Sequence, residues 1–361
     1  MAFNNIYKGK RVLVTGHTGF KGSWLSLWLT QLGAEVFGIA LEPKTADDNF
    51  LVSGLQTKMH HYICNIKDRA KLLTLIGSIR PEILFHLAAQ PLVKQSFDDP
   101  ADTFETNLLG TVHLLEAIRK TPSIKTAVLI TSDKCYKNVE WEWGYRETDT
   151  LGGLDPYGAS KACAELAIES YRASFFNQAS APAVASVRAG NVIGGGDWSE
   201  NRIVPDIIRA LKESSPVKLR NPQAARPWQF VLEPLSGYLW LGARMVESGD
   251  LSSGWNFGPE VSTIVTVGTL TQKMIQLWGS GVMEDISNNV AFHEATLLSL
   301  DISKARYRLQ WRPTLTLDET IAFTVEWYKT FNQNRDMGDF VLGQIAAYTE
   351  KANLRGIPWA N

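Results

Sequence analysis

Residues 10–22 read KRVLVTGHTGFKG. Residues 11–14 predict a buried strand, and the apolar residues after the glycines recur at helical spacing. In a dinucleotide-binding turn, Gly16 permits the tight bend, Gly19 brings a pyrophosphate close to the backbone, and Gly22 lets the helix pack on the sheet. The helix N-terminus then presents its N–H groups to the phosphates. The stretch predicts such a turn, and the alternative is a tight strand–helix turn without a ligand.

The alternation of strand and helix continues through the first half of the chain. Further strands are predicted at residues 36–40, 62–64, 83–87, 127–131 and 184–188, and helices at 24–32, 71–79, 103–120 and 157–175. The strands are short and almost continuously apolar, which is typical of parallel strands covered on both faces. The predicted fold class is therefore α/β, a Rossmann-type doubly wound parallel sheet.

The second half of the chain has a different pattern. A glycine-rich break at 194–196 is followed by helices expected near residues 204–212, 235–246, 267–278 and 317–329. We expect residues 1–190 to form the dinucleotide-binding domain with the catalytic residues. Residues 191–361 would mainly form a smaller C-terminal α/β lobe for the substrate, with interleaved boundaries. The segment after Asn332 has no clear assignment.

Composition and charge exclude several classes of protein. The 361-residue chain has a formal net charge of −1, whereas nucleic-acid binders usually carry a basic excess. Its three cysteines are widely spaced and fit no metal-ligand pattern, so we interpret them as reduced thiols. The N-terminus shows no leader pattern, and no apolar stretch is long enough for a membrane span. We expect a cytoplasmic protein without a metal.

Glu42 lies about twenty residues beyond the last glycine of the turn, at the end of the second predicted strand. A carboxylate at this place bonds the adenine-ribose hydroxyls and repels a 2′-phosphate, which favours NAD over NADP. Lys44 lies close by, and a solvated loop glutamate is the alternative interpretation.

Tyr157 and Lys161 stand four residues apart and so share one helix face. An unperturbed phenol has a pKa of about 10, so a tyrosine that acts as a base near neutral pH needs a lower pKa. The ammonium of Lys161 and an oxidised nicotinamide have the charge that lowers it. A solvated helix face is the alternative, but the preceding nucleotide-binding pattern favours hydride chemistry.

Ser132, Asp133 and Lys134 end the fifth predicted strand, at the sheet edge where ligands bind. A hydroxyl at Ser132 can orient a substrate oxygen, and the alternative is a serine that caps a turn. Asp133 and Lys134 are two titratable groups at the mouth of the cleft, or else a surface ion pair.

With these motifs in place, the chain resembles the extended short-chain dehydrogenase/reductase family over nearly its whole length. Further segments that match the family are HLAAQ at 86–90, TN at 106–107 and RAGN at 188–191. Within the family, the chain is similar to the nucleotide-sugar 4,6-dehydratases, and in particular to their CDP-sugar branch. The segments behind this likeness are GHTGFKG at 16–22, TSDK at 131–134, RPWQ at 226–229, GGGDW at 194–198 and WNFGP at 255–259.

The resemblance implies a dehydratase that carries out an internal hydride transfer from C4 to NAD to C6 of a glucose. Tyr157, with Lys161 and Ser132, would take the proton of the 4-hydroxyl. Asp133 would be the acid for the C6 oxygen and Lys134 the base at C5. The dTDP-sugar branch has a glutamate where this chain has Lys134, whereas the CDP-sugar branch has a lysine.

The resemblance also implies binding residues and partners. For NAD they are Gly16, His17, Thr18, Gly19, Phe20, Lys21, Gly22, Glu42, Asn65, Ile66, Leu87, Ala88, Ala89, Gln90, Asn107, Tyr157 and Lys161. For the nucleotide sugar they are Gln90, Asn191, Arg202 and Arg226; guanidinium groups grip a diphosphate well. Arg220 is an additional candidate for the diphosphate, and His293, in a loop before residue 300, is a candidate for the base or ribose pocket. The predicted partner is a small-molecule nucleotide sugar, with no nucleic acid and no membrane. We also expect a homodimer or homotetramer that pairs through the helices at 103–120 and 157–175.

Two other functions stay open on the sequence alone. A nucleotide-sugar 4-epimerase, or a related NAD-dependent oxidoreductase, would share Tyr157 and Lys161. It would not need Asp133 and Lys134, because nothing is eliminated at C5 and C6. A non-catalytic NAD-sensing protein would keep the glycine turn without needing the tyrosine or the lysine. The presence of all four residues favours the dehydratase.

Overall fold

A seven-stranded parallel sheet forms the centre of the protein in the computed structural model, which describes residues 2–260, 264–287, 298–333 and 335–361. Its strands are β1 (Arg11–Thr15), β2 (Glu35–Ala40), β3 (His60–Ile63), β4 (Ile83–His86), β5 (Thr126–Ile130), β6 (Ala183–Arg188) and β11 (Gly254–Asn256). They are arranged in the order β11-β6-β5-β4-β1-β2-β3. The order reverses beside β1, which places the glycine turn at the switch point where open α/β sheets bind ligands.

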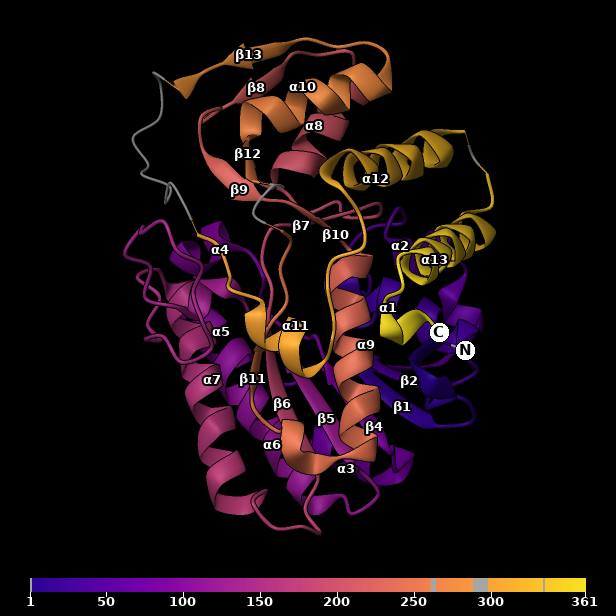
Figure 1. Ribbon diagram of the computed structural model, residues 1–361, viewed down its shortest axis with the longest axis vertical. Coiled ribbons are helices and arrows are strands. Elements are labelled where there is room, and N and C mark those ends of the chain that lie inside the picture. Colours follow the sequence, from indigo (N-terminus) through magenta and orange to yellow (C-terminus); the bar gives the residue numbers. More distant parts are fainter. Residues whose placement is uncertain (1, 261–263, 288–297, 334) are drawn as a thin grey trace.

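Helices cover both faces of this sheet (Figure 1). Leu13 points to one face and packs in a core with the helices α3 (Arg69–Ile79), α6 (Gly110–Lys120) and α7 (Pro156–Phe175). Val12 and Val14 point to the other face, where the cover consists of α1 (Phe20–Gln31) and α9 (Leu232–Glu247), with α13 (Met337–Leu354) packed against α1. Burial on both faces explains why the strands are apolar at nearly every position.

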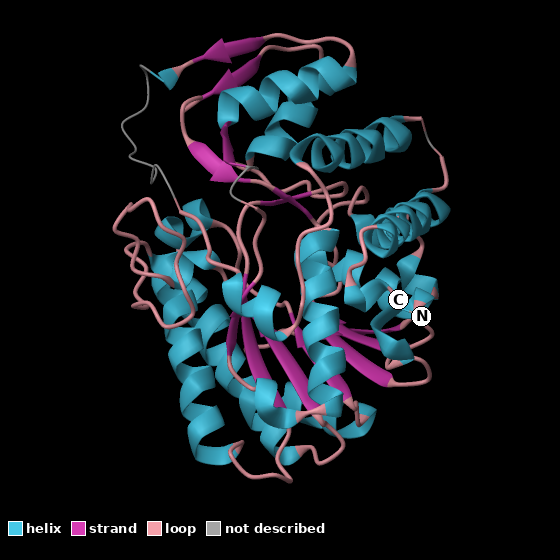
Figure 2. Cartoon of the chain, in the orientation of Figure 1, coloured by secondary structure: helices cyan, strands magenta, loops and turns pink. Residues whose placement is uncertain are grey.

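A smaller lobe lies over one end of the sheet, and the chain enters it from the carboxyl end of β6 (Figure 2). Its helices are α8 (Ile203–Lys212), α10 (Val267–Trp278) and α12 (Leu317–Asn332). Its strands pair in twos: β7 (Val192–Ile193) with β10 (Gln229–Phe230), β8 (Val217–Leu219) with β13 (Met283–Asp285), and β9 (Ala225–Pro227) with β12 (Ile264–Thr266). The lobe therefore faces the carboxyl ends of the parallel strands.

Short elements complete the chain. They are η1 (Ala2–Asn5), α2 (Asn49–Val52), η2 (Leu55–Thr57), α4 (Val93–Asp98), α5 (Pro100–Phe104), η3 (Glu105–Leu109), η4 (Asp133–Cys135), η5 (Gly249–Leu251), α11 (Ser303–Arg308) and η8 (Pro358–Ala360). In the part of the chain that the structure describes, no helix combines the length and the apolar character that a bilayer crossing requires.

The predicted fold class is confirmed, with three differences in detail. The helix expected at 103–120 is divided, because a π-helical segment at 105–109 separates α5 from α6. The unassigned segment after Asn332 contains α13, and its N-cap Asp336 accepts hydrogen bonds from two backbone N–H groups. The strand β11 was not predicted and comes from the second half of the chain, where it pairs with β6.

Candidate active site

The glycine turn has the geometry that a dinucleotide needs. Gly16 has a φ of +76°, and a Cβ there would lie 2.6 Å from the backbone nitrogen of Ala88. A Cβ on Gly22 would lie 2.1 Å from the carbonyl oxygen of Gly16, so helix and turn are in direct contact. At Gly19 the nearest neighbour of such a Cβ is 3.4 Å away, so this side of the turn is open. The first N–H groups of α1 have no partner within the helix, and the open cradle therefore fits a pyrophosphate.

The residues predicted for the adenosine half of NAD follow the neighbouring strands. Glu42 is exposed two residues after β2. Asn65 and Ile66 follow β3; the Asn65 side chain accepts a hydrogen bond of 3.0 Å from the backbone N–H of Lys67, and buried Ile66 packs against Gly110. The sheet thus brings these residues to one edge, and their contacts with the cofactor stay predictions.

Asn107 connects the turn after β4 to the helix α7, which carries Tyr157 and Lys161. This turn contains Leu87, Ala88, Ala89 and Gln90. Its Oδ1 accepts from the backbone N–H of Gln90 at 2.9 Å, and its Nδ2 donates to Ser160 Oγ at 2.9 Å. The Gln90 side chain donates to Leu92 O and to Thr103 Oγ1. Asn107 lies in the π-helical segment, a feature that is frequent at functional sites. The hydrogen bonds of Asn107 and Gln90 thus connect the turn after β4 to α5 and α7.

Two histidines buried next to the turn should make the fold sensitive to acid. Burial lowers the pKa of both His17 and His86 from 6.5 to about 3. The unfolded chain binds a proton at each position below pH 6.5, while the folded protein does not until about pH 3. As the pH decreases from 6.5 to about 3, the free energy of unfolding should therefore decrease, by up to about 1.4 kcal/mol per pH unit for each histidine.

Urea denaturation at pH 7.5 and pH 5.0 measures this dependence. We expect His86→Gln to have a smaller difference between the two pH values than the native chain. His60→Gln, on the exposed part of β3, is the matched control and should keep the native difference. An unchanged difference in His86→Gln would show that the acid sensitivity has another source.

Ser132 and Tyr157 come together, and Lys161 lies one helical turn further along α7. The N-cap Asp155 accepts a hydrogen bond of 2.9 Å from the backbone N–H of Gly158, so α7 begins at Pro156 and its first turn carries the phenol. Ser132 follows β5, and its Oγ donates to Asp133 Oδ1 at 3.0 Å. The same hydroxyl also interacts with the Tyr157 side chain, where it lowers the pKa of the phenol. Ser132 therefore lies between the phenol and the carboxylate.

Burial dominates the electrostatic environment of Tyr157. Burial raises the pKa of Tyr157 to about 12, against the smaller lowering effects of Ser132 and Arg202. The prediction named two positive charges, Lys161 and an oxidised nicotinamide; in the chain alone, desolvation of the buried phenolate outweighs the positive groups around it.

Lys161 and Lys21 belong to a cluster of positively charged side chains that also includes Arg202. Burial, together with the charge of Lys21, lowers the pKa of Lys161 to about 8. Burial also lowers the pKa of Lys21 to about 8, with a further contribution from Arg202 and an opposing one from Asp133 and Asp197. Lys21, from the glycine turn, thus shares its electrostatic surroundings with the catalytic helix and the second lobe.

Asp133 and Lys134 have contrasting surroundings. Asp133 is 6% exposed and Lys134 is exposed, although they are adjacent in η4. Both Ser132 Oγ and the backbone N–H of Lys134 bond to the Asp133 carboxylate, the latter at 2.9 Å. A fixed, buried carboxyl group beside an exposed lysine side chain suits two groups that act on neighbouring substrate atoms.

Gly190 leaves the space that Asp133 occupies, because a Cβ at position 190 would lie 1.7 Å from Asp133 Oδ2. We expect Gly190→Ala to displace this carboxylate and lower the dehydration rate by about 100-fold, the order that a misplacement of 1 Å costs. Gly343→Ala on α13, where a Cβ has nothing within 4 Å, is the control. A product assay on both variants checks the effect, and native activity in Gly190→Ala would contradict it.

The residues predicted for the diphosphate are spread over the second lobe. Asn191 follows β6 with a φ of 52°, and its carbonyl accepts from the backbone N–H of Gln229. Arg202 begins α8 and forms an ion pair of 3.0 Å with buried Asp197, next to the charges of Lys21 and Tyr157. Arg226 lies half-buried on β9 and Arg220 is exposed after β8. His293 lies outside the described residues.

A buried ion pair that was not predicted lies behind the site, between Glu165 on α7 and Arg188 on β6. The signal was present, since Glu165 follows Lys161 by four residues and extends the spacing of Tyr157 and Lys161. No role was predicted for Gly190. Position 190 requires glycine because Asp133, which is distant in the sequence, lies against it in the fold.

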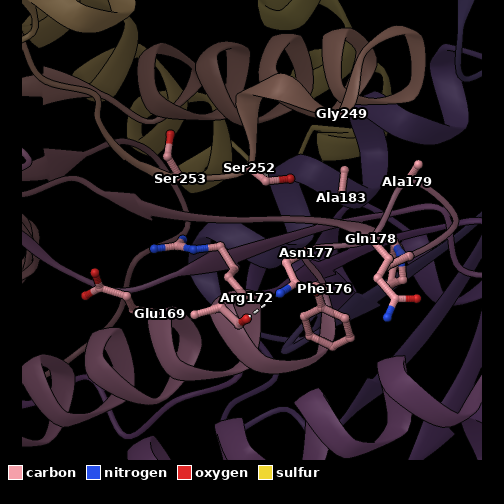
Figure 3. Close-up of a pocket in the computed structure, with 13 residues that line it drawn as sticks. Glu169, Arg172, Phe176, Asn177, Gln178, Ala179, Ala183, Gly249, Ser252 and Ser253 are labelled. Carbon is pink, nitrogen blue, oxygen red and sulfur yellow. Dashed lines mark hydrogen bonds between the residues drawn. The ribbon is translucent and has the colours of Figure 1, made fainter.

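A separate hollow lies at the far end of α7 (Figure 3). It is lined by the last turns of α7, the start of β6 and the segment before β11, including Arg172, Phe176 and Ser253. None of the residues that line it is a predicted site residue. It lies at the amino ends of the strands, opposite the edge where the candidate site is built.

Comparisons with known proteins show which proteins this chain is similar to. A sequence profile described as GDP-mannose 4,6 dehydratase matches residues 13–324. A CDP-glucose 4,6-dehydratase of Salmonella typhimurium is 49% identical over 342 residues, which are 93% of this chain and 95% of that protein. A UDP-glucose 4-epimerase of Mycolicibacterium smegmatis is 28% identical, over 90% of this chain and 100% of its own length.

Solved structures share the fold. The structure of DesIV, a dTDP-glucose 4,6-dehydratase from Streptomyces venezuelae with NAD and TYD bound, matches with a TM-score of 0.77 at 22% sequence identity. The match covers 90% of this chain and 98% of that one. It therefore extends over both the sheet and the second lobe.

Proposed function

This chain belongs to the GDP-mannose 4,6-dehydratase family, within the extended short-chain dehydrogenases/reductases, and we propose that it is an NAD-dependent CDP-glucose 4,6-dehydratase. One observation carries the proposal. Ser132 Oγ interacts with the phenol of Tyr157 and donates to Asp133 Oδ1 at 3.0 Å, so the groups for oxidation and for elimination adjoin in one site. Lys134 follows directly, and an epimerase has no need of this second pair.

Tyr157 and Ser132 serve the first step, which is the oxidation of glucose at C4. Tyr157 takes the proton of the 4-hydroxyl while Ser132 orients that hydroxyl, and the positive charge of Lys161 favours the phenolate. NAD, when bound, would supply a reversible hydride acceptor for C4 and C6. The backbone at Gly16–Gly22 would hold its pyrophosphate, and Glu42 would face its adenine ribose.

Asp133 and Lys134 serve the elimination. The 4-ketone acidifies the C5 proton, which Lys134 removes in its neutral form. Protonated Asp133 gives its proton to the C6 hydroxyl, which leaves as water. Lys134 returns the C5 proton after C6 has been reduced, and the proton held by Tyr157 passes through Ser132 to Asp133. The sum is the loss of one water with no net oxidation or reduction.

Parallel incubations with CDP-glucose and dTDP-glucose test the proposal. We expect a product from CDP-glucose that is lighter by one water and carries a 4-ketone, detected by mass spectrometry, with little from dTDP-glucose. Denatured purified protein incubated beforehand with NAD should release the dinucleotide. An isomer of unchanged mass would instead identify an epimerase, and no turnover of CDP-glucose would contradict the proposal.

We further propose that two copies pair through α6 and α7, which lie side by side in each chain. The outer side of α7 exposes Leu166 and Phe175, by 55% and 49%. Apolar side chains on a helix surface fit a symmetric interface between copies. Light scattering should give two or four times the mass of one chain.

Leu166→Glu should shift the protein toward the monomer, because it places a charge in this interface. Leu354→Glu is the matched control, since Leu354 is 80% exposed on α13. A native chain that is monomeric at micromolar concentration would contradict the pairing.

A further inference from the structure

A buried ion pair anchors the catalytic helix behind the site. Arg188 binds Glu165 through two hydrogen bonds, Nε to Oε1 at 3.0 Å and Nη2 to Oε2 at 2.8 Å. The two side chains are 5% and 1% exposed. Glu165 also accepts the hydroxyls of Thr131 and Ser186, and Thr131 immediately precedes Ser132. The pair therefore holds α7, β6 and the end of β5 in one arrangement.

A chain of hydrogen bonds leads from this pair to Asn256, and in each bond the residue nearer to Arg188 is the donor. The guanidinium of Arg188 has only donors, and its Nη1 donates to the Tyr136 oxygen at 2.6 Å. The Tyr136 hydroxyl donates to Asn256 Oδ1 at 2.9 Å, and burial raises the pKa of Tyr136, which keeps it protonated. The Asn256 Nδ2 then donates to the carbonyls of Tyr145 and Asp301, at 2.8 and 3.1 Å.

This chain connects the acid/base turn to the rest of the molecule. Tyr136 is the residue directly after η4, so its side chain fixes the end of the turn that carries Asp133 and Lys134. Its ring stacks on Tyr145 at 5.2 Å, and Arg188 lies 4.8 Å above it. Asn256 belongs to β11, and the carbonyls that it binds lie in the loops at 145 and 301.

Tyr157 is held by a different set of contacts. Its helix is capped by Asp155, and Ser160 donates to its backbone carbonyl at 2.7 Å and accepts from Asn107. These bonds do not involve Tyr136 or Asn256. The two groups thus share the Arg188–Glu165 pair, which anchors α7, whereas the bonds of Tyr136 and Asn256 lead only from this pair to the turn of Asp133 and Lys134 and to the loops at 145 and 301.

We infer that Tyr136 and Asn256, fixed by Arg188, are positioning residues for the elimination step, an inference that rests on the proposed dehydratase function. The chain Arg188–Tyr136–Asn256 holds Asp133 and Lys134 against C5 and C6 of the sugar. Its loss slows the removal of water while the oxidation at C4 proceeds.

Tyr136→Phe and Tyr145→Phe form a matched pair, because each removes one hydroxyl from one of two stacked rings. The Tyr145 hydroxyl bonds to Asn138 and to the backbone N–H of Val139, within its own loop. We expect Tyr136→Phe to lower kcat for dehydration by about 10–100-fold with KM changed less than about threefold. In a single turnover, its absorbance at 340 nm should rise at nearly the native rate and then persist.

Hydrogen exchange without substrate provides a second readout. Tyr136→Phe should increase amide exchange in residues 131–137, and Tyr145→Phe should leave these residues at the native rate. Asn256→Asp keeps the acceptor for Tyr136 and removes the amide donors, so it should also increase exchange in this segment. Both readouts apply to the whole chain, with thermal melting as a check on folding.

The outcomes separate the inference from the proposed function. If the native chain does not dehydrate CDP-glucose, the function is wrong, and exchange alone decides whether the hydrogen-bond chain holds the turn. If the native chain is active and Tyr136→Phe matches Tyr145→Phe in kcat and in exchange, the positioning role is overturned. Equal loss of the 340 nm rise and of product in Tyr136→Phe would overturn it as well.

Discussion

Tyr157→Phe is expected to lower kcat for CDP-glucose by about 10²–10⁴-fold, the range that general acid–base groups contribute. The phenylalanine ring fills the same buried space at the start of α7, so the fold and the dinucleotide cradle should stay intact. What is lost is the oxygen that takes the proton of the 4-hydroxyl. Product formation by mass spectrometry and reduction of the nicotinamide at 340 nm should both fail, because both follow the first step.

The pH dependence of this step provides the control. The protein alone raises the pKa of Tyr157 to about 12, so the phenolate form becomes more abundant as the pH rises toward that value. The rate of the first hydride transfer should therefore increase with pH in the native chain and lose this slope in Tyr157→Phe. Native turnover by the variant would show that another group takes the proton.

Lys134→Met should lower the rate of dehydration by about 10²–10⁴-fold, as Tyr157→Phe does, but should still allow slow reduction of the nicotinamide. The side chain is exposed, so its replacement should have little effect on the free energy of unfolding. The first step uses Tyr157 and Ser132, whereas removal of the C5 proton needs a base at Lys134. Absorbance at 340 nm without a product lighter by one water is the expected signature.

Lys137→Met is the matched control, because Lys137 is also exposed and lies three residues further along the same segment. It should dehydrate CDP-glucose at the native rate. If Lys134→Met also does so, the base at C5 is another residue. If it loses the 340 nm signal as well, Lys134 takes part in the oxidation.

The sheet was predictable because its strands are buried on both faces. Each of the six strands expected from the sequence lies within two residues of its observed bounds, since a continuous apolar run leaves little freedom in position. The glycine turn was predictable because its backbone conformation and close contacts restrict the residue type at Gly16 and Gly22. Ser132 and Tyr157 come together because Ser132 follows β5 at the sheet edge where α7 begins.

The remaining features depend on contacts between distant segments. The three residues of β11 are too few for a periodic pattern, and their strand character comes from pairing with β6. The bond from Tyr136 to Asn256 joins residues 120 positions apart. The raised pKa of Tyr157 arises from burial by the folded chain, which counting charged neighbours in the sequence does not capture.

The place of β11 in the sheet also bears on how the protein can be divided. The chain leaves the sheet after Arg188, passes through the second lobe, and supplies the outermost strand only at residues 254–256. A fragment that ends at residue 190 would have β6 as a bare border, with one row of N–H and C=O groups open to solvent. Such borders recruit strands from other molecules, so the fragment should aggregate instead of serving as a portable cofactor-binding module.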